Sequence, residues 1–266
     1  MINIDSEIKK AQIAGFKEID ATAKICQDII LSSISRSAMI ENITIKGGVV
    51  MRSISHNARR ATQDIDIDFI RYSLEDDSIR LFIKKLNNIE GLKIELYGKL
   101  EELKQQDYHG KRAYIKIVDS FDFEVTTKID FGVHKHLDIG QEEFCFDIAL
   151  QSDSVSLLIN SKEQMFTEKL RSILKFGTHS TRYKDIFDLY WLSNKIDKNK
   201  LFHCFDVLIF SDLGMKENSL EEIQRRIRKV LESKDFRKNI SSSKKNWLDT
   251  EDDQACDGLI EFLDSL

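Results

Sequence analysis

The spacing of apolar residues changes once along the 266-residue chain, and this change limits the folds that the chain can adopt. Up to about residue 150, several segments alternate apolar and polar side chains, as β-strands with one buried face do. From about Ser161 onward, apolar residues recur at helical spacing instead. The pattern predicts an α+β fold, with a half of strands and helices over residues 1–155, including N-terminal helices, and an all-helical half over residues 156–266.

The expected elements follow from the spacing within each segment. Helices are expected at residues 5–40, 48–56, 75–88, 161–177, 182–192, 198–210, 218–231 and 255–265. Strands are expected at residues 43–48, 64–69, 92–100, 112–118, 121–133 and 142–150, with a hairpin loop over 101–110. Ser161 and Gln164 fit a capping box, and Gly177 suits the position that ends that helix. The polar segment 151–160 marks the boundary between the two halves.

Composition excludes several classes of protein. Hydrophobic residues make up 41% and charged residues 32% of the chain, which is typical of a soluble globular protein. The net charge of −5 argues against a general nucleic-acid coat, although it does not exclude a local basic patch. No apolar run approaches the roughly 20 residues of a membrane helix. The four cysteines are scattered without a CxxC pair. This pattern is typical of buried or inert thiols in a reducing compartment. We therefore expect a cytoplasmic protein that does not enter a membrane.

The stretch "DIDIDF" at residues 64–69 places Asp64, Asp66 and Asp68 on one face of an expected strand. Carboxylates spaced about 6–7 Å apart repel each other unless a cation or solvent screens their charge. Hard oxygen ligands suit Mg²⁺, and two such ions can clamp the oxygens of a phosphoryl displacement. An isolated D-x-D is more often part of a solvent-exposed acidic strand than of a metal site. Its surroundings in the sequence therefore decide between these two interpretations.

The surroundings include "KGG" at residues 46–48, at the end of the preceding expected strand. Glycines let backbone N–H groups approach a triphosphate, and the start of the following helix favours anions. A Gly-Gly pair alone is usually only a turn. Asp64 follows Gly48 by 16 residues, and glycines followed by a D-x-D strand form a far more specific combination.

This combination resembles the signature of the nucleotidyltransferase superfamily, and within it the AbiEii/AbiGii toxin group (MenT-like). Four stretches match that group in order over most of residues 40–195: "KGG" (46–48), "TQDID" (62–66), "EKL" (168–170) and "RYKDIFD" (182–188). The resemblance implies a nucleotidyltransferase-type mixed sheet followed by helices that complete an active-site cleft. The tail after about residue 200 carries no matching motif.

The resemblance implies that Asp64 and Asp66 bind Mg²⁺ or Mn²⁺. A third carboxylate on a neighbouring strand usually completes such a site, and Asp130 is our choice, with Asp122 and Glu124 as rivals on the same strand face. Asp68 is expected to support the site or to face solvent. For Asp130, the alternative is an exposed strand acid.

The resemblance also implies roles for residues in the other motifs. Lys169 would neutralise phosphate charge, and Asp185 and Asp188, which share a helix face, would hold Lys169 and Arg182 or touch the site directly. The alternative is a surface cluster of ion pairs. The expected nucleotide-binding residues are Lys46, Gly47, Gly48, Arg52, Thr62 and Arg182. Thr62 is also a candidate point of modification or control.

The function that follows is metal-dependent transfer of NMP from an NTP to an acceptor, with release of pyrophosphate. The resemblance implies an RNA acceptor, a tRNA 3′ end, and a toxin with a cognate antitoxin. A basic rim of Arg59, Arg60, Lys169, Arg171, Lys175, Arg182 and Lys184, or the run "RRIRK" at 225–229, could hold the RNA backbone. The alternative function is an inactive module that binds a nucleotide or a partner on a transferase scaffold.

Overall fold

The computed structural model describes residues 2–103, 110–150 and 154–266. The chain divides into two compact units, residues 1–160 and residues 161–266. The first unit is a mixed sheet with helices and the second is helical, so the predicted α+β class is confirmed. The expected hairpin loop at 101–110 and the boundary segment at 151–160 lie partly outside the described residues, since residues 104–109 and 151–153 are not among them.

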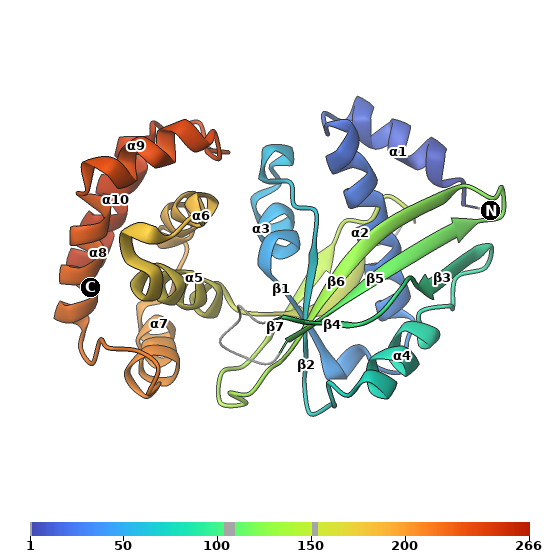
Figure 1. Cartoon of the computed structure of the whole chain (residues 1–266), viewed down its shortest axis with the longest axis horizontal. Coiled ribbons are helices and arrows are strands. Elements are labelled where there is room, and N and C mark those ends of the chain that lie inside the picture. Colours follow the sequence, from blue (N-terminus) through green and yellow to red (C-terminus); the bar gives the residue numbers. More distant parts are fainter. Residues whose placement is uncertain (1, 104–109, 151–153) are drawn as a thin grey trace. The chain divides into compact units, whose positions relative to one another are not determined.

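The first unit is built on one mixed sheet with the strand order β3-β5-β6-β2-β1-β8-β7, with β4 paired to β5 (Figure 1). Strand β2 pairs antiparallel with β1 and parallel with β6. The strands are β1 (Ile43–Lys46), β2 (Ile65–Phe69), β3 (Leu92–Leu96), β4 (Glu101–Leu103), β5 (Gly110–Asp119), β6 (Glu124–Val133), β7 (Glu142–Phe146) and β8 (Val155–Ile159). Its helices are α1 (Ile4–Ile13), α2 (Glu18–Ser35), α3 (Gly47–Ser55) and α4 (Asp76–Lys85).

Alternation in β2 and β6 buries one face of the sheet and leaves the other polar. Phe69 of β2 and Phe131 of β6 are almost fully buried and contact Phe82 of α4 at ring-centroid distances of 5.4 and 5.7 Å. Because side chains alternate along a strand, the aspartates at the even positions of β2 project from the opposite face. The packed aromatic face therefore fixes the direction in which the polar residues point.

The long predicted helix at residues 5–40 is wrong, because it is two helices. The chain turns at Gly15, whose φ of +101° is a conformation that favours glycine. Helix α2 then packs between α1 and the sheet. Strands β4 and β8 and helix α9 were not predicted. Strand β8 is largely apolar but short, and it lies in the segment 151–160 that the sequence marks as the boundary. Helix α9 has only two large apolar residues, Phe236 and Ile240, too few to set a clear period.

The strand predicted at 121–133 begins only at Glu124, because the β5–β6 turn occupies the preceding residues. The Asp119 carboxylate accepts hydrogen bonds from the backbone N–H groups of Phe121, Phe123 and Ile4. Burial alone would raise the pKa of Asp119, but these three N–H donors lower it below its ordinary value. Phe121 is 58% exposed, so its place in the alternating pattern does not reflect burial.

The second unit consists of α5 (Lys162–Phe176), α6 (Tyr183–Ser193), α7 (Lys198–Phe205), α8 (Leu220–Leu231), α9 (Lys234–Ser243) and α10 (Asp252–Asp264), with a π-helical turn at Asp206–Phe210. The Ser161 side chain accepts a hydrogen bond from the Gln164 N–H, and Gly177 ends α5 with a φ of +56°, as predicted. The Gln164 side chain donates to Glu168 instead, so the capping box is only half formed. In the part of the chain that the structure describes, no helix has the length and apolar character needed to span a membrane.

Candidate active site

Four charged residues form one row across the sheet of the first unit. Asp66 lies opposite Lys46 on one side and opposite Asp130 on the other, and Asp130 lies opposite Arg112 of β5. Side chains of cross-strand neighbours project from the same face, so this register brings carboxylates from β2 and β6 together. The register therefore places two of the three predicted metal ligands beside each other.

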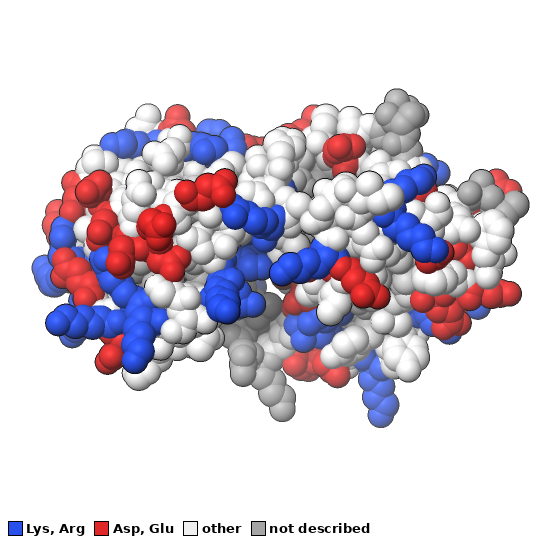
Figure 2. All heavy atoms as spheres, turned by 90° about the horizontal axis from the view of Figure 1, so that it is seen from above, with Lys and Arg blue, Asp and Glu red and all other residues white. Residues whose placement is uncertain are grey.

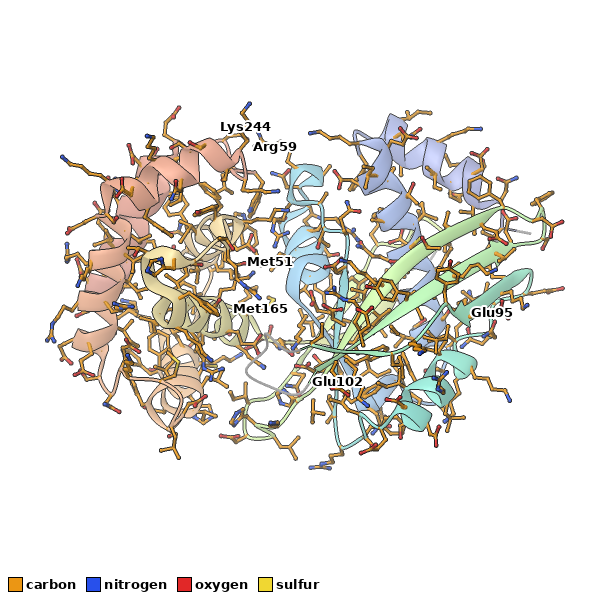
Figure 3. All side chains as sticks on the ribbon, in the orientation of Figure 1. Met51, Arg59, Glu95, Glu102, Met165 and Lys244 are labelled. Carbon is orange, nitrogen blue, oxygen red and sulfur yellow. The ribbon has the colours of Figure 1, made fainter. Side chains whose placement is uncertain are left out.

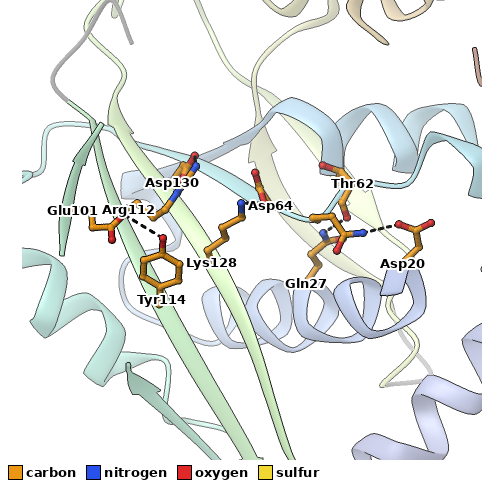
Figure 4. Close-up of polar contacts among 10 residues, drawn as sticks. Asp20, Gln27, Thr62, Asp64, Glu101, Arg112, Tyr114, Lys128 and Asp130 are labelled. Atoms are coloured by element: carbon orange, nitrogen blue, oxygen red, sulfur yellow. Dashed lines mark hydrogen bonds and ion pairs between the residues drawn. The ribbon is translucent and has the colours of Figure 1, made fainter. Parts of the chain in front are cut away.

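Asp130 and Asp64, the two carboxylates near Asp66, each have a basic side chain beside them (Figure 4). Arg112 donates two hydrogen bonds to Asp130, at 2.7 and 2.8 Å, and this pairing raises the pKa of Arg112 above its ordinary value despite partial burial. Lys128 Nζ lies 2.9 Å from Asp64 Oδ1. The face is thus an alternating array of positive and negative groups, which reduces the repulsion among its carboxylates.

Asp68 is buried and does not face solvent, so that alternative is wrong. Its Oδ1 lies 2.7 Å from Lys46 Nζ. Lys46 is itself the residue before α3 and stands beside the two glycines. Asp68 therefore holds in place a lysine that was predicted to bind phosphate.

The glycines leave room for the acidic side chains. Gly47 has a φ of +67°, and a Cβ atom at this position would overlap the Asp66 carboxylate. A Cβ atom on Gly48 would overlap the side chain of Thr62. Both residues begin α3. The first N–H groups of a helix have no acceptor within the helix, and they favour anions. Predicted nucleotide-binding and metal-binding residues thus meet at the start of one helix.

The other sequence candidates in this unit lie in different surroundings. Arg52 is buried on α3 and donates a hydrogen bond to Gln27, while burial lowers the pKa of its guanidinium. Gln27 also donates to the Thr62 carbonyl at 2.9 Å, so α2 supports the segment that leads into β2. The rivals of Asp130 are both exposed: Asp122 in the β5–β6 turn and Glu124 at the start of β6.

The carboxylates fit a divalent cation in their donor chemistry. Asp64 Oδ1 is buried and has no hydrogen-bond partner among the described residues, although Lys128 approaches it as an ion-pair partner. The absence of a side chain at Gly47 makes room for the Asp66 carboxylate itself. However, no group of three His, Cys, Asp or Glu side chains in the described ranges has an arrangement that would hold a metal ion. By donor chemistry alone Asp64 and Asp66 stay candidate ligands, whereas both oxygens of Asp130 are bound by Arg112.

Gly132 of β6 is a site feature that the sequence alone did not reveal. A Cβ atom here would overlap Asp68 Oδ1 and lie 3.5 Å from Lys46 Nζ. We expect Gly132→Ala to lower the free energy of unfolding by about 1–3 kcal/mol through overpacking. Displacement of Lys46 should also reduce nucleotide transfer by about 100-fold.

Denaturant unfolding and labelled-nucleotide transfer would measure both effects. Gly140→Ala is the matched control, because a Cβ atom on Gly140 meets no atom within 4 Å. Equal behaviour of the two variants would contradict the role given to Gly132.

The helical unit carries a second polar cluster, formed by residues of the "EKL" and "RYKDIFD" motifs. Lys169 Nζ lies 2.6 Å from Asp185 Oδ1 and 2.8 Å from Asp188 Oδ2. The indole N–H of Trp247 donates to Asp188 Oδ1 at 2.9 Å. Asp188 is fully buried, so the alternative of a surface ion-pair cluster is wrong for this residue. Arg182 is exposed, with its guanidinium 3.9 Å from Asp185. Trp247 lies outside the matched motifs, so no sequence pattern indicates that it belongs to this cluster.

The predicted basic rim is only partly exposed. Arg60 and Arg171 are buried, and Arg171 pairs with Asp212, so these two cannot line a surface. Arg59 is exposed beyond the C-terminal end of α3 (Figure 3). In the run at 225–229, Arg228 pairs with Glu232 and Asp264. Figure 2 shows basic and acidic side chains interspersed on the face that is seen, which is unlike a continuous nucleic-acid-binding stripe.

Comparison with known proteins places these features in a family. A family model described as nucleotidyl transferase AbiEii toxin, type IV TA system, matches residues 29–260. No curated protein matches the chain. The crystal structure of an antigenic nucleotidyltransferase-like protein from Paracoccidioides brasiliensis matches with a TM-score of 0.46 and 15% identity, covering 82% of this chain and 92% of that chain. Since the family model spans far more than half of the sequence, the chain belongs to the AbiEii nucleotidyltransferase toxin family of type IV toxin–antitoxin systems.

Proposed function

We propose that the protein transfers NMP from an NTP to the 3′ hydroxyl of an RNA, and that it uses Mg²⁺ or Mn²⁺. The observation that carries the proposal is the close approach of the Asp66 carboxylate to Gly47, the first residue of α3. Carboxylates next to a helix start join a cation-binding group to a phosphate-binding group. That combination suits phosphoryl transfer, in which positioning and charge neutralisation supply most of the rate.

In the proposed reaction, the acceptor oxygen forms a bond to the α-phosphorus and the bond from that phosphorus to the β-phosphate bridge oxygen breaks. Pyrophosphate leaves, and the acceptor hydroxyl loses its proton. The N–H groups at the start of α3 and the Lys46 ammonium, held by Asp68, bind the triphosphate. Asp64 and Asp66 would hold the divalent cation, which neutralises charge on the reacting phosphate.

Two further parts of the proposal come from the sequence motifs and the family. Lys169 remains the candidate for neutralising triphosphate charge because it lies in the "EKL" motif; within the helical unit its ammonium group is held by Asp185 and Asp188. A type IV toxin–antitoxin family implies a cognate antitoxin as a partner. The proposed acceptor is tRNA, through its 3′ end.

A second candidate function is a binding module without transferase activity. Arg112 and Lys128 support it, because they occupy the positions around Asp130 and Asp64 where a second cation would be expected. Such a protein would bind a nucleotide or a partner while leaving the acceptor RNA unchanged.

The two candidates are separated by incubating the purified chain with total RNA, Mg²⁺ and each α-labelled NTP in turn. Transfer predicts label in RNA, an equal amount of pyrophosphate, and loss of both when EDTA is added. Thermal stabilisation by Mg²⁺ and an NTP, with no label in RNA for any of the four nucleotides, would favour the binding module instead.

A further inference from the structure

The first unit contains a pocket of about 570 Å³, and none of the predicted site residues lines it. We call it the corner pocket. Its wall includes Ile19 and Thr22 from α2, Gln63 just before β2, Tyr97 just after β3, Tyr114 of β5 and Lys128 of β6. We propose that the corner pocket binds the terminal nucleoside of the acceptor RNA strand. This inference rests on the proposed function and adds a binding site to it.

The pocket adjoins the candidate metal ligands. Lys128 lines the pocket and pairs with Asp64 at 2.9 Å, and Tyr114 lies opposite Lys128 in the sheet (Figure 4). Strand β2 pairs with β6 from Ile129 onward, so residues 124–128 of β6 extend past the start of β2. The corner left between this extension and α2 holds the pocket. A ligand there would lie next to Asp64.

The lining suits a nucleoside better than a phosphate. Tyr97 and Ile19 are 61% and 71% exposed, which is unusual for large apolar side chains and offers flat and apolar surface to a base. Tyrosine rings stack on bases of single-stranded nucleic acids with little dependence on sequence. Hydroxyl, amide and carboxylate groups of Thr22, Gln63 and Glu18 can bond to the edge of a base or to a ribose. The volume falls within the range of small-molecule sites.

The position of the pocket indicates that its ligand is the acceptor strand rather than the incoming nucleotide. Strand β2 lies between β1 and β6 in the sheet. The glycines that begin α3 follow β1 and lie against Asp66 and Thr62, on one side of β2. The corner pocket lies on the β6 side, next to Asp64. Since the triphosphate occupies the glycine side, the group on the opposite side of the aspartates is the one that attacks.

Two variants test the corner pocket. Tyr97→Ala removes an exposed ring, and Thr22→Trp fills the pocket from the first turns of α2. The matched control is Phe121→Ala, because Phe121 is an aromatic residue of similar exposure, 58% against 61%, outside the pocket. The probe is a fluorescein-labelled single-stranded RNA octamer of mixed sequence, with the full chain titrated against it. A second readout is thermal stabilisation by Mg²⁺ and each NTP without RNA.

We expect both pocket variants to raise the Kd for the octamer at least about fivefold, as the loss of one base–aromatic stack does. NTP stabilisation should stay unchanged, and Phe121→Ala should match the wild type in both assays. Unchanged octamer binding in both pocket variants, or no octamer binding by the wild type, would overturn the inference. Loss of NTP stabilisation with intact RNA binding would also overturn it, because the pocket would then serve the incoming base. Octamer binding that depends on the pocket without any nucleotide transfer would refute the proposed function alone.

Discussion

Asp66→Asn is expected to reduce NMP transfer at least about 1,000-fold, while the free energy of unfolding stays within about 0.5 kcal/mol of the wild type. Asn keeps the shape of the side chain and its place opposite Lys46 and Asp130. It removes the negative charge that a divalent cation requires, and a catalytic cation contributes several kcal/mol to the transition state. Asparagine is isosteric with aspartate and keeps an oxygen acceptor at this position, so we expect the fold to change little.

Labelled-NTP transfer and denaturant unfolding measure these two quantities, and thermal shift with Mg²⁺ and NTP measures binding. Asp122→Asn is the matched control, because Asp122 is an exposed acid in the β5–β6 turn with a φ of +59° that asparagine tolerates. Asp68→Asn supplies the contrast, since loss of the buried pair with Lys46 should lower stability by about 1–3 kcal/mol. If Asp66→Asn kept more than a tenth of wild-type transfer, Asp66 could not be a metal ligand in the reaction.

The elements of this fold that the sequence predicts are those determined by interactions between residues close together in the sequence. The α5 boundaries depend on Ser161, Gln164 and Gly177, which act through local hydrogen bonds and backbone conformation. Strand β2 follows from the alternation of two aspartates with two isoleucines and a phenylalanine, and Asp64 lies just before it. The alternating pattern gave a wrong start for β6. Phe121 occupies an apolar position of the pattern, but the turn in which its N–H bonds to Asp119 places it before the strand.

The contacts of the candidate site depend on strand order and register, which no local pattern contains. Arg112 and Asp130 are paired because β5 and β6 form an antiparallel hairpin with one particular register. Lys128 reaches Asp64 because β6 runs parallel to β2 and extends past its start. The corner pocket arises from the same offset. The family motifs identified these aspartates and Lys46, but not Arg112 and Lys128, which pair with Asp130 and Asp64 in the folded chain.

Lys169→Met is expected to lower the free energy of unfolding of the helical unit by about 3–5 kcal/mol, because it breaks a buried ion pair by removing one partner. Lys169 Nζ lies 2.8 Å from Asp188, whose side chain is fully buried, and 2.6 Å from Asp185. Methionine fills a similar volume but supplies no charge to these carboxylates. The measurement is direct, because both tryptophans of the chain, Trp191 and Trp247, lie in this unit and report its unfolding by fluorescence.

A second substitution separates stability from function. Asp188→Asn removes the buried charge but keeps an oxygen that can accept the Trp247 N–H hydrogen bond. The double variant Lys169→Met/Asp188→Asn should therefore regain at least about 1 kcal/mol relative to Lys169→Met, which a double-mutant cycle would measure as coupling. If Lys169 neutralises triphosphate charge, this double variant stays inactive in nucleotide transfer although its stability recovers. Recovery of transfer together with stability would show that Lys169 serves only the fold of the helical unit.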